Sequence, residues 1–188
     1  MDSTATSPML DRLLAGEEYV ADELVDQLTD TAAAKASGYN SSPSGDPAAR
    51  HALLVSMLGS VGEGVVIRPP MRVDLGTHIS IGDRTFVNFG LVALDIAPIT
   101  IGSDVQIGPN VQLLTPTHPL DAERRRAKWE GGAPITIGDN VWLGGGVIVC
   151  PGVTIGENTV VGAGAVVASD LPANVLAVGN PARVIRQL

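Results

Sequence analysis

The chain has 188 residues, of which 45% are hydrophobic but only 3% aromatic, with 22 glycines and 13 prolines. This composition predicts one domain with an N-terminal extension, in which a turn-rich β fold encloses a core of small and branched aliphatic side chains. The formal net charge of -8 argues against nucleic acids and anionic membranes as main partners, because both are polyanions held chiefly by Lys and Arg.

The first segment, "MDSTATSPML", has no basic stretch followed by an apolar run. No later stretch reaches the ~18 consecutive apolar residues that are needed to cross a bilayer. We therefore expect a cytoplasmic protein.

Three short helices are predicted in the segment that follows. Each runs from a capping or helix-starting residue to a glycine: Ser7-Pro8 to Gly16, Asp22 to Gly38, and Asp46-Pro47 to Gly59. Such short helices bury little surface alone, so we expect them to pack on a larger body.

From near Val73 the sequence repeats every six residues. The units include "ISIGDR", "ITIGSD", "VQIGPN", "ITIGDN", "VWLGGG" and "VTIGEN", with an aliphatic residue third and usually glycine fourth. The repeat is interrupted between about residues 115 and 134, but the glycines at 102, 108, 138, 144, 156 and 162 stay separated by multiples of six. The interruption is therefore an excursion that leaves the repeat in register.

A period of six fits a short strand followed by a tight corner, and three such units close a triangular coil. We expect the first and third residues to face a shared core, and the fourth-place glycine to allow a positive φ or a close backbone approach. Residues 73–182 without the interruption predict roughly five coils of a parallel β-helix stacked about 4.8 Å apart. The residues themselves do not fix its handedness, since parallel crossovers are right-handed as a rule.

The only cysteine, Cys150, lies in the repeat "VIVCPG". A single cysteine excludes an internal disulfide and a cysteine-rich zinc site. We expect it to be a small packed residue rather than a nucleophile.

The repeats resemble the hexapeptide-repeat acyltransferases, whose β-helix is left-handed. Further matches in "GEEYVADELVDQ", "THPLD" and "GNPARVI" resemble the maltose and galactoside O-acetyltransferase branch over nearly the whole chain. The resemblance implies acetyl-CoA as co-substrate, no required metal, and a homotrimer with active sites between subunits. It also implies two regions: a helical acceptor-side region at 1–60, and a mainly β domain at 61–188 with the loop 115–134 and a C-terminal tail.

The excursion contains His118, one of three histidines. Long loops inside a compact domain are usually functional or disordered, and this one could supply the pocket wall that flat coil faces lack. Imidazole takes up and releases a proton near neutral pH, so His118 suits the general base that activates an acceptor hydroxyl. The resemblance places the oxyanion donor at the backbone N–H of Gly145.

The resemblance also suggests which residues meet the acceptor. Asn88 would lie beside His118 at the hydroxyl, with a turn or a stacked polar ladder as its structural alternative. The other acceptor-side candidates are Asp74, Asp95, Tyr19, Asp22 and Glu130. Carboxylates accept hydrogen bonds from sugar hydroxyls, but solvated turns and helix packing are the competing explanations for these residues.

On the cofactor side, Trp142 resembles a family tryptophan along the pantetheine arm. The remaining predicted contacts to coenzyme A (CoA) are Gly144, Gly145, Gly162, Ala163, Ala168, Arg183 and Arg186. The two arginines suit phosphate groups. Ala168-Ser169 departs from the Thr-Lys pair common in the family, which removes one expected phosphate contact. We interpret the basic run 124–128 as a solvated loop face, with trimer or phosphate contacts as alternatives.

Other functions are also compatible with a coil of this kind. A zinc-dependent γ-carbonic anhydrase needs three converging histidines, but His51 falls in a predicted helix, away from His78 and His118. A scaffolding solenoid, or transfer to an amine or antibiotic, are the remaining alternatives. The sequence predicts transfer of acetyl from acetyl-CoA to a hydroxyl of a sugar or similar molecule, without identifying the acceptor.

Overall fold

The computed structural model describes residues 6–43 and 45–188. The three predicted N-terminal helices are present as α1 (Pro8–Leu14), α2 (Glu23–Asn40) and α3 (Pro47–Met57). Side chains cap each of them: Ser7 accepts the N–H of Leu10 at 3.0 Å, and Asp22 and Asp46 do the same for α2 and α3. Short polar side chains satisfy N–H groups that have no partner inside the helix.

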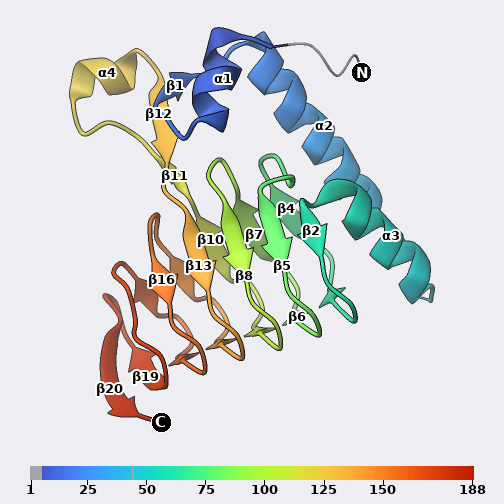
Figure 1. Cartoon of the computed structure of the whole chain (residues 1–188), viewed down its shortest axis with the longest axis vertical. Coiled ribbons are helices and arrows are strands. Elements are labelled where there is room, and N and C mark those ends of the chain that lie inside the picture. The colour runs from blue at the N-terminus through green and yellow to red at the C-terminus, as the bar shows by residue number, and fades with distance from the viewer. Residues whose placement is uncertain (1–5, 44) are drawn as a thin grey trace.

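Helix α2 continues through Gly38, where the sequence predicted its end. The extension is explained by packing, because the buried Tyr39 donates its hydroxyl hydrogen to the carbonyl oxygen of Ile67 on the first coil. The next residue, Asn40, exchanges two hydrogen bonds of 2.9 Å with the backbone of Met71. These contacts fix α2 against the coil, and Figure 1 shows α2 and α3 leaning on that end of the stack.

The rest of the chain is a stack of triangular coils, each contributing one strand to each of three sheets (Figure 1). The first sheet contains β2 (Ser60–Val61), β5 (Ile79–Ile81), β8 (Ile99–Ile101), β13 (Ile135–Ile137) and β16 (Thr154–Ile155). The second contains β4 (Met71–Val73), β7 (Leu91–Leu94), β10 (Gln112–Leu114), β15 (Ile148–Val149) and β18 (Val166–Val167). The third contains β3 (Val66–Ile67), β6 (Phe86–Val87), β9 (Gln106–Ile107), β14 (Trp142–Leu143), β17 (Val160–Val161), β19 (Val175–Val178) and β20 (Arg183–Gln187). The strands are parallel except for the last, β20, which pairs antiparallel with β19.

Equivalent places in successive repeats pair directly. Ile99 lies opposite Ile135 across the excursion, and Trp142 lies between Gln106 and Val160. The first coil begins at Ser60 in β2, and Val73, where the sequence first showed the repeat, ends the third strand of this coil, β4. The corner "IRPPMR" of this coil lacks the glycine and the Asn or Asp that mark later corners, whereas the corner before it has Gly62 and Gly64.

Residues in the first and third places fill the core as predicted, and Ile135, Val141 and Leu143 are 0% exposed. Cys150 is half-buried and packs against this core. The fourth-place glycines are explained by close approach alone: a Cβ on Gly138 would lie 2.7 Å from the backbone nitrogen of Glu157 in the next coil. Positive φ falls in the sixth place instead, at 54° in Asn140 and 58° in Asn158.

The excursion is an ordered structure rather than an irregular loop. It contains β11 (Pro116–Thr117), α4 (Ala122–Arg126) and β12 (Trp129–Gly132). Strand β12 pairs antiparallel with both β11 and the N-terminal β1 (Tyr19–Val20), forming a small three-stranded sheet. Figure 1 shows this sheet rising from the edge of the coils beside α1. Within the described residues, no helix is both long and apolar enough to span a membrane.

Candidate active site

Two adjoining hollows of about 540 and 310 Å³ share Ala21, His118 and Glu130. The larger is completed by Val20, Arg125 and Lys128. The smaller is completed by Tyr19, Val25, Asp26, Thr29, Asp74, Leu94, Ile96 and Pro116. Their walls therefore come from β1, α2, the turns after β4 and β7, and the excursion, and the exposed His118 lies where the two hollows meet.

Strand pairing places Tyr19 directly opposite Glu130. The Tyr19 side chain is 1% exposed, and its hydroxyl has no hydrogen-bond partner among the described residues. Burial, followed by the neighbouring Glu130 and Asp74 carboxylates, raises the pKa of Tyr19. The hydroxyl therefore stays protonated at neutral pH, with the Glu130 carboxylate beside it.

Asp74 enters the hollow from the turn after β4. Burial, followed by the charges of Asp95 and Glu130, raises the pKa of Asp74 to about 6. Two predicted acceptor-side carboxylates, Asp74 and Glu130, thus meet Tyr19 and His118 in one hollow. Like charges and low solvation disfavour the ionised form of a carboxyl group, which explains the direction of the shift.

Asp95 lies beneath this surface and is 0% exposed. It accepts hydrogen bonds from the backbone N–H groups of Asp74, Leu75 and His78 at 3.0, 2.9 and 3.2 Å. Asp22 is not part of the hollow either, since it caps α2 by accepting from Leu24 and Val25. Hydrogen bonds from Ser7 and then the helix backbone lower the pKa of Asp22. That Asp95 and Asp22 contact the acceptor stays a prediction.

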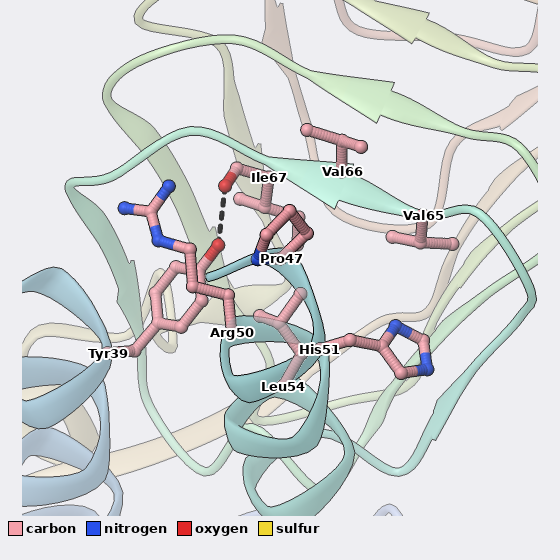
Figure 2. Close-up of a pocket in the computed structure, with 8 residues that line it drawn as sticks. All are labelled: Tyr39, Pro47, Arg50, His51, Leu54, Val65, Val66 and Ile67. Atoms are coloured by element: carbon pink, nitrogen blue, oxygen red, sulfur yellow. Dashed lines mark hydrogen bonds between the residues drawn. The ribbon is translucent and has the colours of Figure 1, made fainter. Parts of the chain in front are cut away.

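The three histidines occupy three separate places. His78 turns its Nδ1 to the carbonyl oxygens of Asp95 and Ile96, at 3.1 and 3.2 Å. His51 borders a different pocket of about 210 Å³ between α3 and β3, lined mainly by apolar side chains (Figure 2). In that pocket the Tyr39 hydroxyl is bonded to Ile67, and none of the predicted site residues takes part. Among the described residues, no group of three potential ligands is placed to hold a metal ion.

The predicted cofactor-side residues, except Ala168, and the predicted catalytic residue Asn88 lie on the third sheet and its corners, away from the hollow. Trp142 on β14 is 55% exposed. Asn88, just after β6, accepts the N–H of Phe89 at 2.9 Å through its side-chain oxygen. Neither side chain lines the hollow of its own chain. Arg183 and Arg186 are exposed on β20, and Ala168 is exposed after β18.

The corner after β14 presents free backbone donors. Gly144 and Gly146 donate to Val161 and Pro109 at 2.8 Å, whereas Gly145 between them donates no hydrogen bond found among the described residues. The same holds for Ala163, the corresponding residue of the next coil. At other corners, as at Ser103, the N–H in this place bonds to a side chain of the next coil, Asp139, at 2.7 Å. The corresponding residues of the next coil have no such side chain, so the N–H groups of Gly145 and Ala163 stay free within the described part of the chain.

Sequence reasoning missed the apolar and N-terminal part of the hollow. Leu94 ends β7 and Ile96 lies in the turn after it, and Val25, Asp26 and Thr29 come from α2. Val25 and Asp26 lie in "GEEYVADELVDQ" but stand out in no other way, and the packing of α2 over the coil edge brings all five residues to His118. Of the basic run, Arg124 pairs with Glu18 at 2.5 Å and Arg126 with Glu123 in the same helix. Arg125 donates to the carbonyl oxygens of Pro119 and Leu120, so three of these side chains have partners inside the chain.

Comparisons with known proteins agree with this architecture. Residues 134–169 match the family model described as bacterial transferase hexapeptide (six repeats), and residues 12–62 match the maltose acetyltransferase hexapeptide capping motif. The chain is 47% identical to Nodulation protein L of Rhizobium meliloti, over 95% of this chain and 98% of that one.

Solved structures extend the similarity to three dimensions. A maltose O-acetyltransferase from Clostridium difficile 630 matches with a TM-score of 0.94 and 40% identity, over 98% of this chain and 99% of that one. A galactoside acetyltransferase in complex with coenzyme A matches with a TM-score of 0.90 and 38% identity, over 97% of this chain and 92% of that one. The coils therefore form a left-handed parallel β-helix, which the resemblance implied.

Proposed function

We propose that this chain, which belongs to the hexapeptide-repeat acetyltransferases in their maltose and galactoside O-acetyltransferase branch, moves acetyl from acetyl-CoA to a hydroxyl of a sugar or sugar-like molecule. The observation that supports it most is the position of His118, which lies at a hollow that also holds Tyr19, Asp74 and Glu130. A general base beside several hydroxyl-binding groups suits a polyhydroxylated acceptor.

In the proposed reaction, His118 accepts the proton of the acceptor hydroxyl while the hydroxyl oxygen attacks the thioester carbonyl carbon. The negative charge on the carbonyl oxygen is stabilised by the free N–H of Gly145. The tetrahedral intermediate then collapses, the carbon–sulfur bond breaks, and the CoA thiolate takes the proton from the imidazolium. A thioester is already activated for acyl transfer, so the mechanism assigns no step to a metal.

The polar and apolar sides of the hollow suit different parts of a sugar ring. Asp74 and Glu130 would accept hydrogen bonds from acceptor hydroxyls, and the buried Tyr19 hydroxyl would donate one. Leu94 and Ile96 offer an apolar surface to the C–H face of the ring. Asp95 would contribute indirectly by holding the turn that carries Asp74. Asp22 is offered as an acceptor contact on the resemblance alone.

We place CoA along Trp142, with the open N–H groups of Gly145 and Ala163 as donors and with Gly144, Gly162 and Ala168 beside it. Arg183 and Arg186 would meet its phosphates. Because Asn88 and Trp142 lie away from the hollow of their own chain, we propose a homotrimer in which one subunit supplies His118 and its neighbour Asn88. Residues 1–60 then form the acceptor side and residues 61–188 the catalytic β-helix. We assign the enzyme to the cytoplasm, where acetyl-CoA is available.

A thiol-release assay with acetyl-CoA and a panel of sugars, alcohols and amines tests this function. We expect release with at least one hydroxylated acceptor, and a kcat lower by ~10² to 10⁴-fold in His118→Ala, the usual share of a general base. His51→Ala is the matched control, since His51 borders the separate pocket in Figure 2. Normal activity of His118→Ala would refute its assignment as the general base. Thiol release with amines alone would show that the acceptor is an amine and not a hydroxyl.

A further inference from the structure

Side chains from the N-terminal helix and from the excursion meet on Trp129 of β12. The guanidinium carbon of Arg12, in α1, lies 5.6 Å from the centroid of the Trp129 ring, and that of Arg124, in α4, lies 5.4 Å from it. Glu18 joins the two arginines, because its carbonyl oxygen accepts from Arg12 Nε at 2.6 Å and its carboxylate from Arg124 at 2.5 Å. We call Arg12, Glu18, Arg124 and Trp129 the Trp129 clasp.

The clasp lies one residue away from the acceptor hollow. Successive side chains of a strand point to opposite faces, so Trp129 points away from the face on which Glu130 lies opposite Tyr19. Strand β11, which ends at Thr117 immediately before His118, pairs with the same β12. A displacement of β12 would therefore move both His118 and Glu130 relative to Tyr19 and Asp74.

Strand pairing joins β11 to β12 and β12 to β1, but the α4 part of the excursion has few other contacts. Helix α4 spans only five residues and has no buried side chain. Isolated helices of that length are unstable in water. Arg126 bonds only to Glu123 of the same helix, and Arg125 only to the carbonyl oxygens of Pro119 and Leu120, among the described residues. The attachment of α4 to the N-terminal region thus depends on Arg124, through Glu18 and the Trp129 ring.

We infer that Trp129 is a positioning residue for acetyl transfer: clasped by Arg12 and Arg124, it fixes the excursion so that His118 and Glu130 face Tyr19 and Asp74. This inference rests on the proposed function of His118. It makes the N-terminal helix α1 part of the device that orders the catalytic loop, although α1 itself stays outside the hollow.

Trp129→Ala tests the inference in the full-length enzyme. We expect kcat to fall about tenfold to a hundredfold and the acceptor KM to rise, because small misplacements of a catalytic group carry such losses. The KM for acetyl-CoA should stay within twofold of the wild type. Trp129→Phe, which keeps an aromatic face for the guanidinium groups, should restore part of kcat. Arg126→Ala, in the same helix but outside the clasp, is the control and should leave all three values unchanged.

Hydrogen–deuterium exchange of residues 116–132 gives a readout that does not depend on catalysis. We expect faster exchange in Trp129→Ala and in Arg12→Gln, which perturbs the clasp from outside the loop, but not in Arg126→Ala. Unchanged exchange, or faster exchange with wild-type kcat and acceptor KM, would overturn the inference. If His118→Ala proves fully active, the proposed function fails. The exchange and the acceptor KM of Trp129→Ala still test whether the Trp129 clasp orders the excursion.

Discussion

Asp95 holds the turn that carries Asp74, because its buried carboxylate accepts the backbone N–H of Asp74 at 3.0 Å and two further N–H groups of the same turn. The sequence predicted that Asp95 contacts the acceptor, but its carboxylate lies beneath the surface of the hollow and binds the backbone. The residue above it, Asp74, is left without a cationic partner among the described residues, and it is this side chain that lines the hollow.

We predict that Asp95→Ala lowers the free energy of unfolding by roughly 3 kcal/mol or more, because buried N–H groups lose a charged acceptor. Asp95→Asn should lose less, since its amide oxygen can still accept. Urea unfolding measures both. Asp170→Ala is the control: the exposed Asp170 accepts a single bond, from the N–H of Thr154 at 2.7 Å, and its loss should cost about 1 kcal/mol. Equal losses at the two sites would contradict this account.

Asp74→Asn should stabilise the fold at high pH. The pKa of Asp74 is raised from 3.8 to about 6, so the folded state binds the proton more tightly than the unfolded state. Stability therefore falls as pH rises between about 4 and 6, and the penalty is complete above that window. The groups facing Asp74 in or beneath the hollow are Tyr19, Asp26, Asp95, His118 and Glu130.

We expect the variant to exceed the wild type by about 1 to 3 kcal/mol at pH 8 and to match it near pH 4. Urea unfolding at the two pH values provides the measurement. A gain that is the same at both pH values would show that ionisation of Asp74 is not its cause.

Gly138→Ala should destabilise the coils by roughly 3 kcal/mol, since its Cβ would lie 2.7 Å from the backbone of Glu157. Gly38→Ala is the matched control. Gly38 lies inside α2 with no atom within 4 Å of a built Cβ, so this substitution should stabilise the protein by about 0.5 to 1 kcal/mol. Thermal unfolding of the two variants should move in opposite directions, and a shared direction would count against the packing argument.

Trp142→Ala should raise the KM for acetyl-CoA about tenfold, which corresponds to ~1.4 kcal/mol of lost apolar contact with the pantetheine arm. The acceptor KM should change little. Leu14→Ala removes another exposed large apolar side chain, 62% exposed in α1, and should leave the KM for acetyl-CoA unchanged. An unchanged KM in Trp142→Ala would remove CoA from this face of the third sheet.

Local sequence rules predicted much of the fold because the coil repeats a local structure. Ile135, Ile137 and Leu143 face inward by strand alternation, and Asn140 in the sixth place adopts positive φ as a turn residue does. The repeat is recognisable only from Val73, because the corner "IRPPMR" of the first coil lacks glycine and asparagine signals, although the family resemblance places the start of the β domain at residue 61. Helix α2 passed Gly38 because contacts with Ile67 and Met71 outweighed a local stop signal.

The candidate site was predictable only where a residue stood out from the repeat. His118 did so, as part of a register-preserving excursion, and Trp142 did so in an outward-facing place. Leu94, Ile96 and Thr29 carry no such signal, because their role depends on α2 lying across the coil edge. The pairing of Trp129 with Arg12 could not be predicted either, since the residues lie more than a hundred positions apart and in different elements.

The sequence by itself determined the coil, its register across the excursion and the histidine held out from it, because each follows from a six-residue period or its interruption. Only the tertiary structure decided that Asp95 supports the turn while Asp74 faces the hollow, and that β1 completes the sheet behind His118. The physical reason is that a period specifies contacts between neighbouring coils, whereas the hollow is built from contacts between non-repeating segments, whose meeting depends on packing.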